Sequence, residues 1–291
     1  EAVTASQTWT ASTAVLYVLL SFRTYQALSR FWEGTSLLHQ MRGEWFDSVS
    51  CLISFSTCAV PKYPHEVRSF RHTIVRLMSL CHGSALEEIA DTDHLIAIDT
   101  LGLDVSTLRH LKKAKVEYGF NRVECLLHLF QTLITKAMED GIVPIDPPIL
   151  SRVYQTLSRG FVNLLNAKKI VDTRFPFPYA QLIAQLLFLH LFLTPLMMAS
   201  LIRNSMAFAT ICTVVPVWGT FSLNFVATQL ENPFGNDDND LPLEHFQTEM
   251  NSSLLMLLHP AADHDPVPSK KIITDFNVLE NKGGTAHRRH S

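Results

Sequence analysis

Charged residues are scarce in this chain. Asp, Glu, Lys and Arg make up 18% of its 291 residues, against roughly 25% in soluble domains, whereas apolar residues reach 47%. The net charge of −3 is too small to indicate a nucleic-acid partner, so we expect none. With a mean hydropathy of +0.14, these values predict a protein with a membrane part and a polar part.

The motifs of several common enzyme classes are also lacking. The sequence contains no H-E-x-x-H pattern, no nucleophile elbow and no phosphate-binding loop. The five cysteines form no C-x-x-C pair, and we expect them to be buried free thiols. We therefore predict that the protein is not an enzyme. A membrane metallohydrolase that uses some of the thirteen histidines is the enzymatic alternative.

Two apolar stretches without Asp, Glu, Lys or Arg lie in the second half of the chain. Residues 179–202 would form a helix of about 36 Å, enough to cross a hydrocarbon core of about 30 Å. Residues 206–227 are similar, and Arg203-Asn204-Ser205 separates the two as a tight loop. The pair predicts a transmembrane hairpin, with Pro216 as a kink, and a soluble core hairpin is the alternative.

The rest of the chain predicts an all-α protein, a membrane helical bundle with a cytosolic helical domain. Residues 11–60 indicate one or two long helices, of which 11–22 are too short to span a membrane alone. Helical periodicity continues in the polar middle, where Asp146-Pro147-Pro148 marks a helix start. The expected parts are 1–60 (N-terminal helices), 61–175 (cytosolic domain), 176–228 (hairpin), 229–260 (acidic turn and helix) and 261–291 (disordered tail).

An acidic turn follows directly on the second apolar stretch. Residues 229–240 read Q-L-E-N-P-F-G-N-D-D-N-D. Its carboxylates and amides are the oxygen donors that a hard cation such as calcium needs. An EF-hand is excluded, because a loop opening at Asp237 has Pro242 at the sixth position and Thr248 at the twelfth. A solvated turn that caps the next helix is the alternative to a cation site.

Four motifs in this order resemble the bestrophins, a family of pentameric anion channels. Four segments of this chain are similar to segments of the family. In chain order they are Ser21-Phe22-Arg23 with Arg30-Phe31-Trp32-Glu33-Gly34, Asp146-Pro147-Pro148-Ile149-Leu150, Pro176-Phe177-Pro178-Tyr179-Ala180-Gln181, and the acidic turn. Together they cover most of residues 11–258. The segment L-P-L-E-H-F after the acidic turn is more similar to algal or protist members than to animal ones. A first membrane helix is expected ahead of residue 11 and is absent or truncated here.

The resemblance implies a homopentamer around a central pore that passes chloride, or bicarbonate or nitrate, passively across a bilayer. It also implies that Ala14, Val18 and Phe22, which share a helix face, line an apolar pore neck. Such a ring can gate by dewetting, and the Phe22 ring edge can face an anion. Ala14 is smaller than the usual residue, which predicts a wider outer neck. By spacing alone, the same residues also fit an ordinary packing stripe.

Two further sites follow from the same resemblance. Pro148, with Ile149 beside it, corresponds to the cytosolic exit constriction, although a Pro-initiated helix explains both residues equally well. A calcium clasp corresponds to four oxygen-bearing residues of the acidic turn. They are Gln229, Asn232, Asp237 and Asp240.

Several charged or titratable residues outside these sites have alternative interpretations. Arg23 would place a positive field near the inner vestibule and raise the local anion concentration, or it forms a solvated or inter-subunit salt bridge. Arg30 and Glu33 have the spacing of a helical ion pair. His190, within the first predicted span, is expected to be packed or hydrogen-bonded rather than a proton relay.

The alternatives to a channel are a coupled secondary transporter and a non-conducting membrane scaffold. A transporter usually shows inverted repeats and ionisable residues in mid-membrane, and here we find no repeat and only His190. Algal relatives include thylakoid members, so the resemblance leaves two locations open, the plasma membrane and the chloroplast thylakoid membrane.

Overall fold

The computed structural model describes residues 2–90, 95–235, 237 and 239–280. Within these residues the secondary structure is helical and contains no strand. The helices are α1 (Ala2–Ser56), η1 (Thr57–Ala59), α2 (Pro64–Ala90), η2 (Thr100–Gly102), α3 (Val105–Tyr118), α4 (Arg122–Glu139), α5 (Pro147–Asp172), α6 (Phe177–Leu201), α7 (Met206–Leu230), α8 (Leu243–Met256) and η3 (Pro260–Asp263). The all-α prediction is therefore confirmed.

The chain divides into two compact units, residues 1–257 and 258–291. The first unit contains α1 to α8, and the second contains η3. The finer division at residues 60, 175 and 228 stays a prediction. The expected disorder of 261–291 also stays one, since 281–291 lie outside the described residues.

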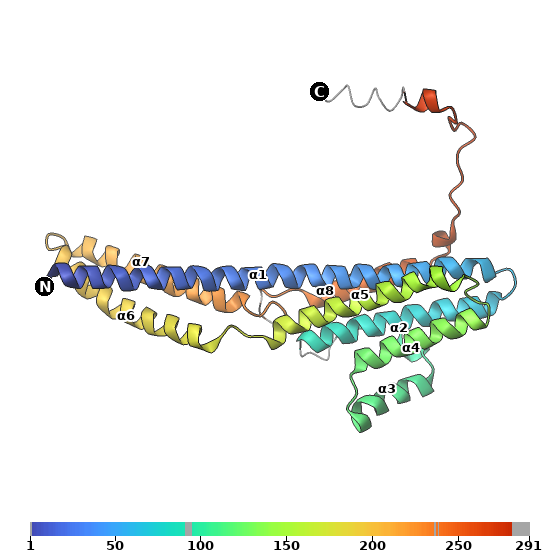
Figure 1. Ribbon diagram of the computed structural model, residues 1–291, viewed down its shortest axis with the longest axis horizontal. Helices are drawn as coiled ribbons and strands as arrows, with labels where there is room; N and C mark the ends of the chain where they lie inside the picture. Colours follow the sequence, from blue (N-terminus) through green and yellow to red (C-terminus); the bar gives the residue numbers. More distant parts are fainter. Residues whose placement is uncertain (1, 91–94, 236, 238, 281–291) are drawn as a thin grey trace. The chain divides into compact units, whose positions relative to one another are not determined.

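Helix α1 is the longest element of the first unit and lies along α5, α6 and α7 (Figure 1). Its 55 residues correspond to about 80 Å of helix, far more than the roughly 30 Å of a hydrocarbon core. The sequence left open one or two helices here, and the structure has one up to Ser56. Residues 2–56 contain no proline, and their two glycines do not interrupt the helix.

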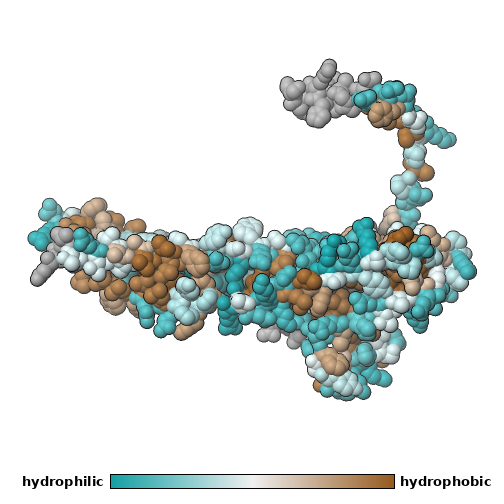
Figure 2. Space-filling view, in the orientation of Figure 1, coloured by the Kyte–Doolittle hydropathy of each residue, from teal (hydrophilic) through white to brown (hydrophobic). Residues whose placement is uncertain are grey.

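Helices α6 and α7 form the predicted hairpin, and both are long and apolar enough to cross a membrane. Each begins or ends within three residues of its predicted boundary, and α7 continues through Pro216. Leu16 and Leu20 of α1 pack against Ile183 and Leu187 of α6 in an apolar cluster. Figure 2 shows hydrophobic side chains gathered on the surface over α6 and α7. Apolar side chains turned outward are expected where the solvent is lipid.

Helices α2, α5 and α8 pack with α1, while α4 packs against α2 and α3 packs against α4; we call α2 to α5 and α8, with the C-terminal half of α1, the polar part. Trp45 of α1 is fully buried, and its Nε1 donates to the carbonyl of Leu157 on α5 at 3.2 Å. A Cβ atom at Gly160 would lie 2.3 Å from the Trp45 ring, so glycine is required for α5 to approach α1. Arg42 also joins α1 to α8 through Glu249, at 2.8 Å.

Local signals placed the helices of the polar part well. Asp146 is the N-cap residue of α5, with proline in the first turn as predicted. Helical periodicity predicts helices over Val67–Leu80, Val123–Met138 and Ile149–Ile170, and these segments lie within α2, α4 and α5. The expectation of buried cysteines is only partly correct: all five thiols are free and Cys81 is buried, but Cys58 is exposed.

Candidate functional site

The predicted neck residues lie on one exposed side of α1. Ala14 is exposed, Val18 is 69% exposed and Phe22 is 46% exposed, whereas Leu16 and Leu20 are buried against α6. The helix therefore separates a packed face from an apolar face that its own chain leaves open. That open face is available to lipid, to another copy of the chain or to a pore.

The Phe22 ring contacts two other aromatic rings. Its centroid lies 6.4 Å from that of Phe175, just before α6, and 6.2 Å from that of Tyr179 in the first turn of α6. Both distances are in the range of favourable tilted aromatic pairs. The Phe22 ring is thus positioned by the α5–α6 connection while about half of its surface stays open.

The next residue, Arg23, is buried and makes two side-chain hydrogen bonds. Its Nε donates to Glu231 Oε1 at 2.7 Å, and a terminal nitrogen donates to Asn224 Oδ1 at 2.7 Å. The guanidinium carbon lies 5.5 Å from the centre of the Phe175 ring, a cation–π distance. Arg23 does form a salt bridge, but it is buried and lies within one subunit, not solvated or between subunits. A field source for the vestibule is not supported, because the positive charge is neutralised within the subunit.

Arg30 makes backbone contacts instead of the helical ion pair that its spacing suggested. Its guanidinium donates to the carbonyls of Glu231 at 3.1 Å, of Ile170 at 2.6 Å and of Thr173. Two of these carbonyls belong to the C-terminal end of α5, where helix carbonyls lack partners and a cation is favourable. One side chain therefore ties the middle of α1 to α5 and to the end of α7.

The acidic turn also packs against the first motif of α1. Phe234 is 1% exposed, and a Cβ atom at Gly34 would lie 2.9 Å from its ring and 3.2 Å from Pro233. Glycine at position 34 is therefore needed for this close approach. Segments about 200 positions apart in the sequence meet here, and we call the contact of Arg23, Arg30 and Gly34 with Glu231 and Phe234 the junction.

The structure gathers three of the four expected calcium ligands in the acidic turn. The Asp237 N–H donates to Asp240 Oδ2 at 2.7 Å. A Cβ atom at Gly235 would lie 2.5 Å from Asp240 Oδ2 and 3.3 Å from Asn232 Nδ2, so both side chains converge on this glycine. The fourth residue, Gln229, lies in the last turn of α7.

The electrostatics of the turn suit a cation. Burial raises the pKa of the Asp240 carboxyl; the Asp237 N–H opposes this change and the Asp237 charge adds to it. A bound cation would offset both destabilising effects. No group of three or more His, Cys, Asp or Glu residues suited to a metal occurs among the described residues, which do not include Asp238. Amide and carbonyl oxygens would have to complete the set, as calcium allows.

Pro148 and Ile149 lie in the first turn of α5. Both are exposed, Ile149 by 52%. They are on the polar part, away from the hairpin, as an exit constriction requires. The exposure also agrees with a simple Pro-initiated helix.

His190 is packed between α1 and α6, as expected. Its Nδ1 lies 3.2 Å from Thr194 Oγ1 and 3.4 Å from Thr13 Oγ1. Trp9 Nε1 donates to the same Thr194 hydroxyl at 3.2 Å, and the Tyr17 ring lies edge-on to the imidazole. These contacts involve Nδ1 alone, since His190 Nε2 is buried and has no hydrogen-bond partner among the described residues.

A buried polar network in the polar part was missed by the sequence argument. His82 on α2 is fully buried, and its Nδ1 lies 2.7 Å from Gln247 Oε1 on α8. Gln247 also donates to the Ser79 carbonyl and to Asn251 Oδ1, and Asn251 accepts from Ser79 Oγ at 2.6 Å. A histidine followed by Gly83, which leaves room for Gln247, was the available signal.

Comparisons with known proteins identify similar sequences and a similar fold. A family model described as bacterial/fungal bestrophin protein matches residues 2–256. A voltage-dependent anion channel-forming protein of Synechocystis is 26% identical over 259 residues, covering 82% of this chain and 73% of its own. A protein of the same description from Nostoc is 26% identical over 258 residues, covering 79% and 70%.

A solved structure supports the fold. The crystal structure of a bacterial bestrophin homologue from Klebsiella pneumoniae is similar with a TM-score of 0.70 at 20% identity, covering 87% of this chain and 88% of that chain. At this identity the likeness concerns the arrangement of helices alone.

Proposed function

The chain belongs to the bestrophin family, and we propose that it forms a passive anion channel whose neck is lined by Ala14, Val18 and Phe22. It is an integral membrane protein, with α6 and α7 as spans. The proposed assembly is a homopentamer in which five copies of α1 surround a common axis.

One observation carries the proposal: the apolar side of α1 that its own chain leaves open. Val18 and Phe22 are exposed on the side opposite the cluster of Leu16 and Leu20. Turned inward in a ring, these side chains form a narrow apolar passage that excludes water when closed and conducts when wetted. The ring–ring contacts of Phe22 support a defined position for the narrowest side chain.

The exposed side of α1 continues beyond the length that a membrane can cover. Val18, Tyr25 and Trp32 are spaced by seven residues and are 69%, 69% and 62% exposed. A seven-residue repeat of apolar positions is the pattern of helices that pack side by side. Large aromatic surfaces in the water-facing half are costly unless another copy covers them, which supports oligomerisation through α1.

Anions suit such a neck better than small cations. Stripping water from a weakly hydrated anion costs less than stripping it from a small cation, and the positive edge of the Phe22 ring favours negative charge. Chloride is the proposed permeant ion, with bicarbonate or nitrate as further candidates. Pro148 and Ile149 are proposed as the cytosolic constriction, where their exposed side chains and the positive dipole end of α5 meet the exit.

We propose calcium as a ligand of the acidic turn through Gln229, Asn232, Asp237 and Asp240. The convergence of Asn232 and Asp240 on Gly235 supports this. The junction provides a route from that turn to the neck, because Glu231 contacts Arg23, the neighbour of Phe22. Which membrane holds the channel, plasma membrane or thylakoid, stays a prediction.

Purification and reconstitution test the proposal. The mass of the detergent-solubilised protein should correspond to five subunits, and planar bilayers should show anion-selective currents that follow the gradient. A coupled transporter would instead give slow, saturating currents tied to a second ion. A scaffold would assemble without any conductance, and protein that neither forms pentamers nor conducts anions would refute the channel.

A further inference from the structure

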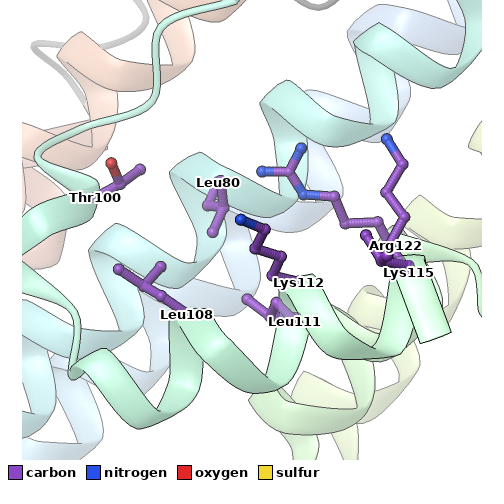
Figure 3. Close-up of a pocket in the computed structure, with 8 residues that line it drawn as sticks. Leu80, Thr100, Leu108, Leu111, Lys112, Lys115 and Arg122 are labelled. Carbon is purple, nitrogen blue, oxygen red and sulfur yellow. The ribbon is translucent and has the colours of Figure 1, made fainter.

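A pocket of about 300 Å³ lies in the polar part, between α2 and α3 and far along the chain from the neck and the acidic turn. Figure 3 shows it with Leu80 from α2, Thr100 from η2, and Leu108 and Leu111 from α3. Its volume is at the lower end of the roughly 300–1,000 Å³ that small-molecule sites occupy. The pocket therefore suits one small ligand and is too small for a two-chain lipid.

The apolar side of the pocket is aliphatic. Leu80 and Leu111 are each 6% exposed and form the base, and Leu108 and Val116 line the wall. None of the described residues that line this pocket is aromatic, so they offer no stacking surface for a nucleobase. Branched aliphatic side chains match a hydrocarbon chain, whose burial gains free energy with each methylene.

The pocket is also cationic, because the face of α3 that carries Leu108 and Leu111 carries two lysines as well. Lys112 and Lys115 are three residues apart on α3 and so share a face, and Arg122 at the start of α4 completes the group (Figure 3). Arg122 is loosely paired with Glu87 at 3.4 Å, and the intervening Lys113 is paired with Glu117. Among the described residues, Lys112 and Lys115 have no carboxylate within ion-pair distance, so their charges are available to a ligand.

A second cavity of about 270 Å³ adjoins the first and shares Leu80, Thr100 and Arg122 with it. Ser84 lines this cavity, and its side chain is 5% exposed. In the described part of the chain, its Oγ finds no hydrogen-bond partner. A buried hydroxyl without a partner is costly, and this polar group distinguishes the second cavity from the aliphatic pocket beside it.

We propose that this pocket binds a small amphipathic anion, a single aliphatic chain with a terminal carboxylate. The carboxylate lies between Lys112 and Lys115, where charge-assisted hydrogen bonds hold it. The aliphatic chain of the ligand covers the side chains of Leu80, Leu108 and Leu111. A fatty acid of medium length has this chemistry. The site is separate from the anion pathway, and its occupancy does not depend on whether the protein conducts.

Binding of radiolabelled decanoate to the full chain in lipid nanodiscs tests the proposal, with empty nanodiscs as background. The test variant is Lys112→Gln with Lys115→Gln. The matched control is Arg109→Gln with Lys113→Gln, which removes the same two charges from α3 at exposed positions that do not line the pocket. Equal unfolding temperatures of the two double variants would show that both are folded.

We expect saturable binding of one decanoate per subunit to the wild type and to the control. The Lys112/Lys115 variant should bind at least about tenfold more weakly, since it loses charge-assisted contacts. Leu108→Gln should also weaken binding, because it places a polar group in the aliphatic wall. Neither 1-decanol nor acetate should displace the label, since each lacks half of the recognised chemistry.

Three results would overturn the site: no saturable binding above empty nanodiscs, equal binding by both double variants, or displacement by 1-decanol as effective as by decanoate. None of them bears on the proposed channel, which is tested by current. Loss of current with intact decanoate binding would likewise leave this site standing.

Discussion

Arg23 Nε donates to Glu231 Oε1 at 2.7 Å and joins residues that are 208 positions apart. The pair connects the neck end of α1 to Glu231, the C-cap residue of α7 within the acidic turn. Both side chains are largely buried, at 10% and 21% exposure, so each charge depends on the other for compensation. The contact thus links the two regions to which we assign permeation and cation binding.

Removing one member of this pair should destabilise the protein. Glu231→Ala leaves Arg23 buried with only Asn224 as a side-chain acceptor, and we expect a loss of up to about 3 kcal/mol in unfolding free energy. The double substitution Arg23→Met with Glu231→Met should recover most of it, because no charge is left unpaired. Thermal unfolding of the purified protein measures both. Anion selectivity should persist in the double variant; its collapse would show that Arg23 supplies a permeation field after all.

Phe22→Ala should change gating or ion selectivity while the assembly stays intact. The ring contributes exposed surface to the proposed neck, and its contacts with Phe175 and Tyr179 are worth only about 1 kcal/mol. Single-channel recordings in chloride gradients measure the change, and the mass in detergent checks assembly.

The control for this substitution is Phe225→Ala on α7. Phe225 is 64% exposed on the predicted lipid-facing hairpin. Its replacement by alanine therefore removes an equivalent aromatic ring at a position away from the neck. Currents of Phe22→Ala that match those of Phe225→Ala and of the wild type would remove α1 from the pore.

Local sequence signals account for most of the helices. Length and lack of charge located α6 and α7, because a membrane span is recognisable within one segment. Asp146 and the prolines after it located the start of α5, because capping is also local. The continuity of α1 was left open since a hydropathy argument cannot distinguish one long helix that leaves the membrane from two shorter ones.

The contacts of the junction could not be predicted from local patterns. Arg30 and Glu33 have the spacing of an ion pair, yet Arg30 donates to carbonyls on α5 and after α7, because those helix ends lie beside it in the fold. The need for Gly160 beside Trp45 is equally invisible in sequence, where the two are 115 positions apart. Such contacts depend on which helices the fold brings together. The His82 network belongs to the same class, since its partner Gln247 lies on α8.

Calcium dependence of the current, if the turn binds calcium, should disappear in Asp237→Ala with Asp240→Ala. Asp240→Asn is the informative control, because it keeps an acceptor for the Asp237 N–H and removes the charge that a cation requires. We expect the control to fold like the wild type and to bind calcium at least about tenfold more weakly. Current recorded at increasing calcium concentrations measures the calcium dependence, and calorimetric titration measures the calcium affinity. An unchanged calcium response in the double variant would place any clasp elsewhere.

Stability should fall with acidification because of His82. Burial lowers the pKa of His82 from 6.5 to about 4, and nearby Arg42 adds to this, while the hydrogen bond with Gln247 opposes it. The folded state therefore holds the imidazole neutral, whereas the unfolded chain takes up a proton near pH 6.5. The contribution of His82 to the free energy of unfolding is fully present above pH 6.5 and declines as the pH falls toward 4. It amounts to about 3 kcal/mol in total.

His82→Asn isolates this contribution, because asparagine can keep a contact with Gln247 and does not titrate. The difference in unfolding free energy between wild type and variant should narrow as the pH is lowered from 7 to 4 at constant ionic strength. His65→Asn, at an exposed histidine on the same helix, should leave the pH dependence of the wild type unchanged. If the difference in unfolding free energy between wild type and His82→Asn stayed constant from pH 6.5 to 4, the prediction would be wrong. The imidazole would then gain a proton in the folded state, and the α2–α8 contact would accommodate its charge.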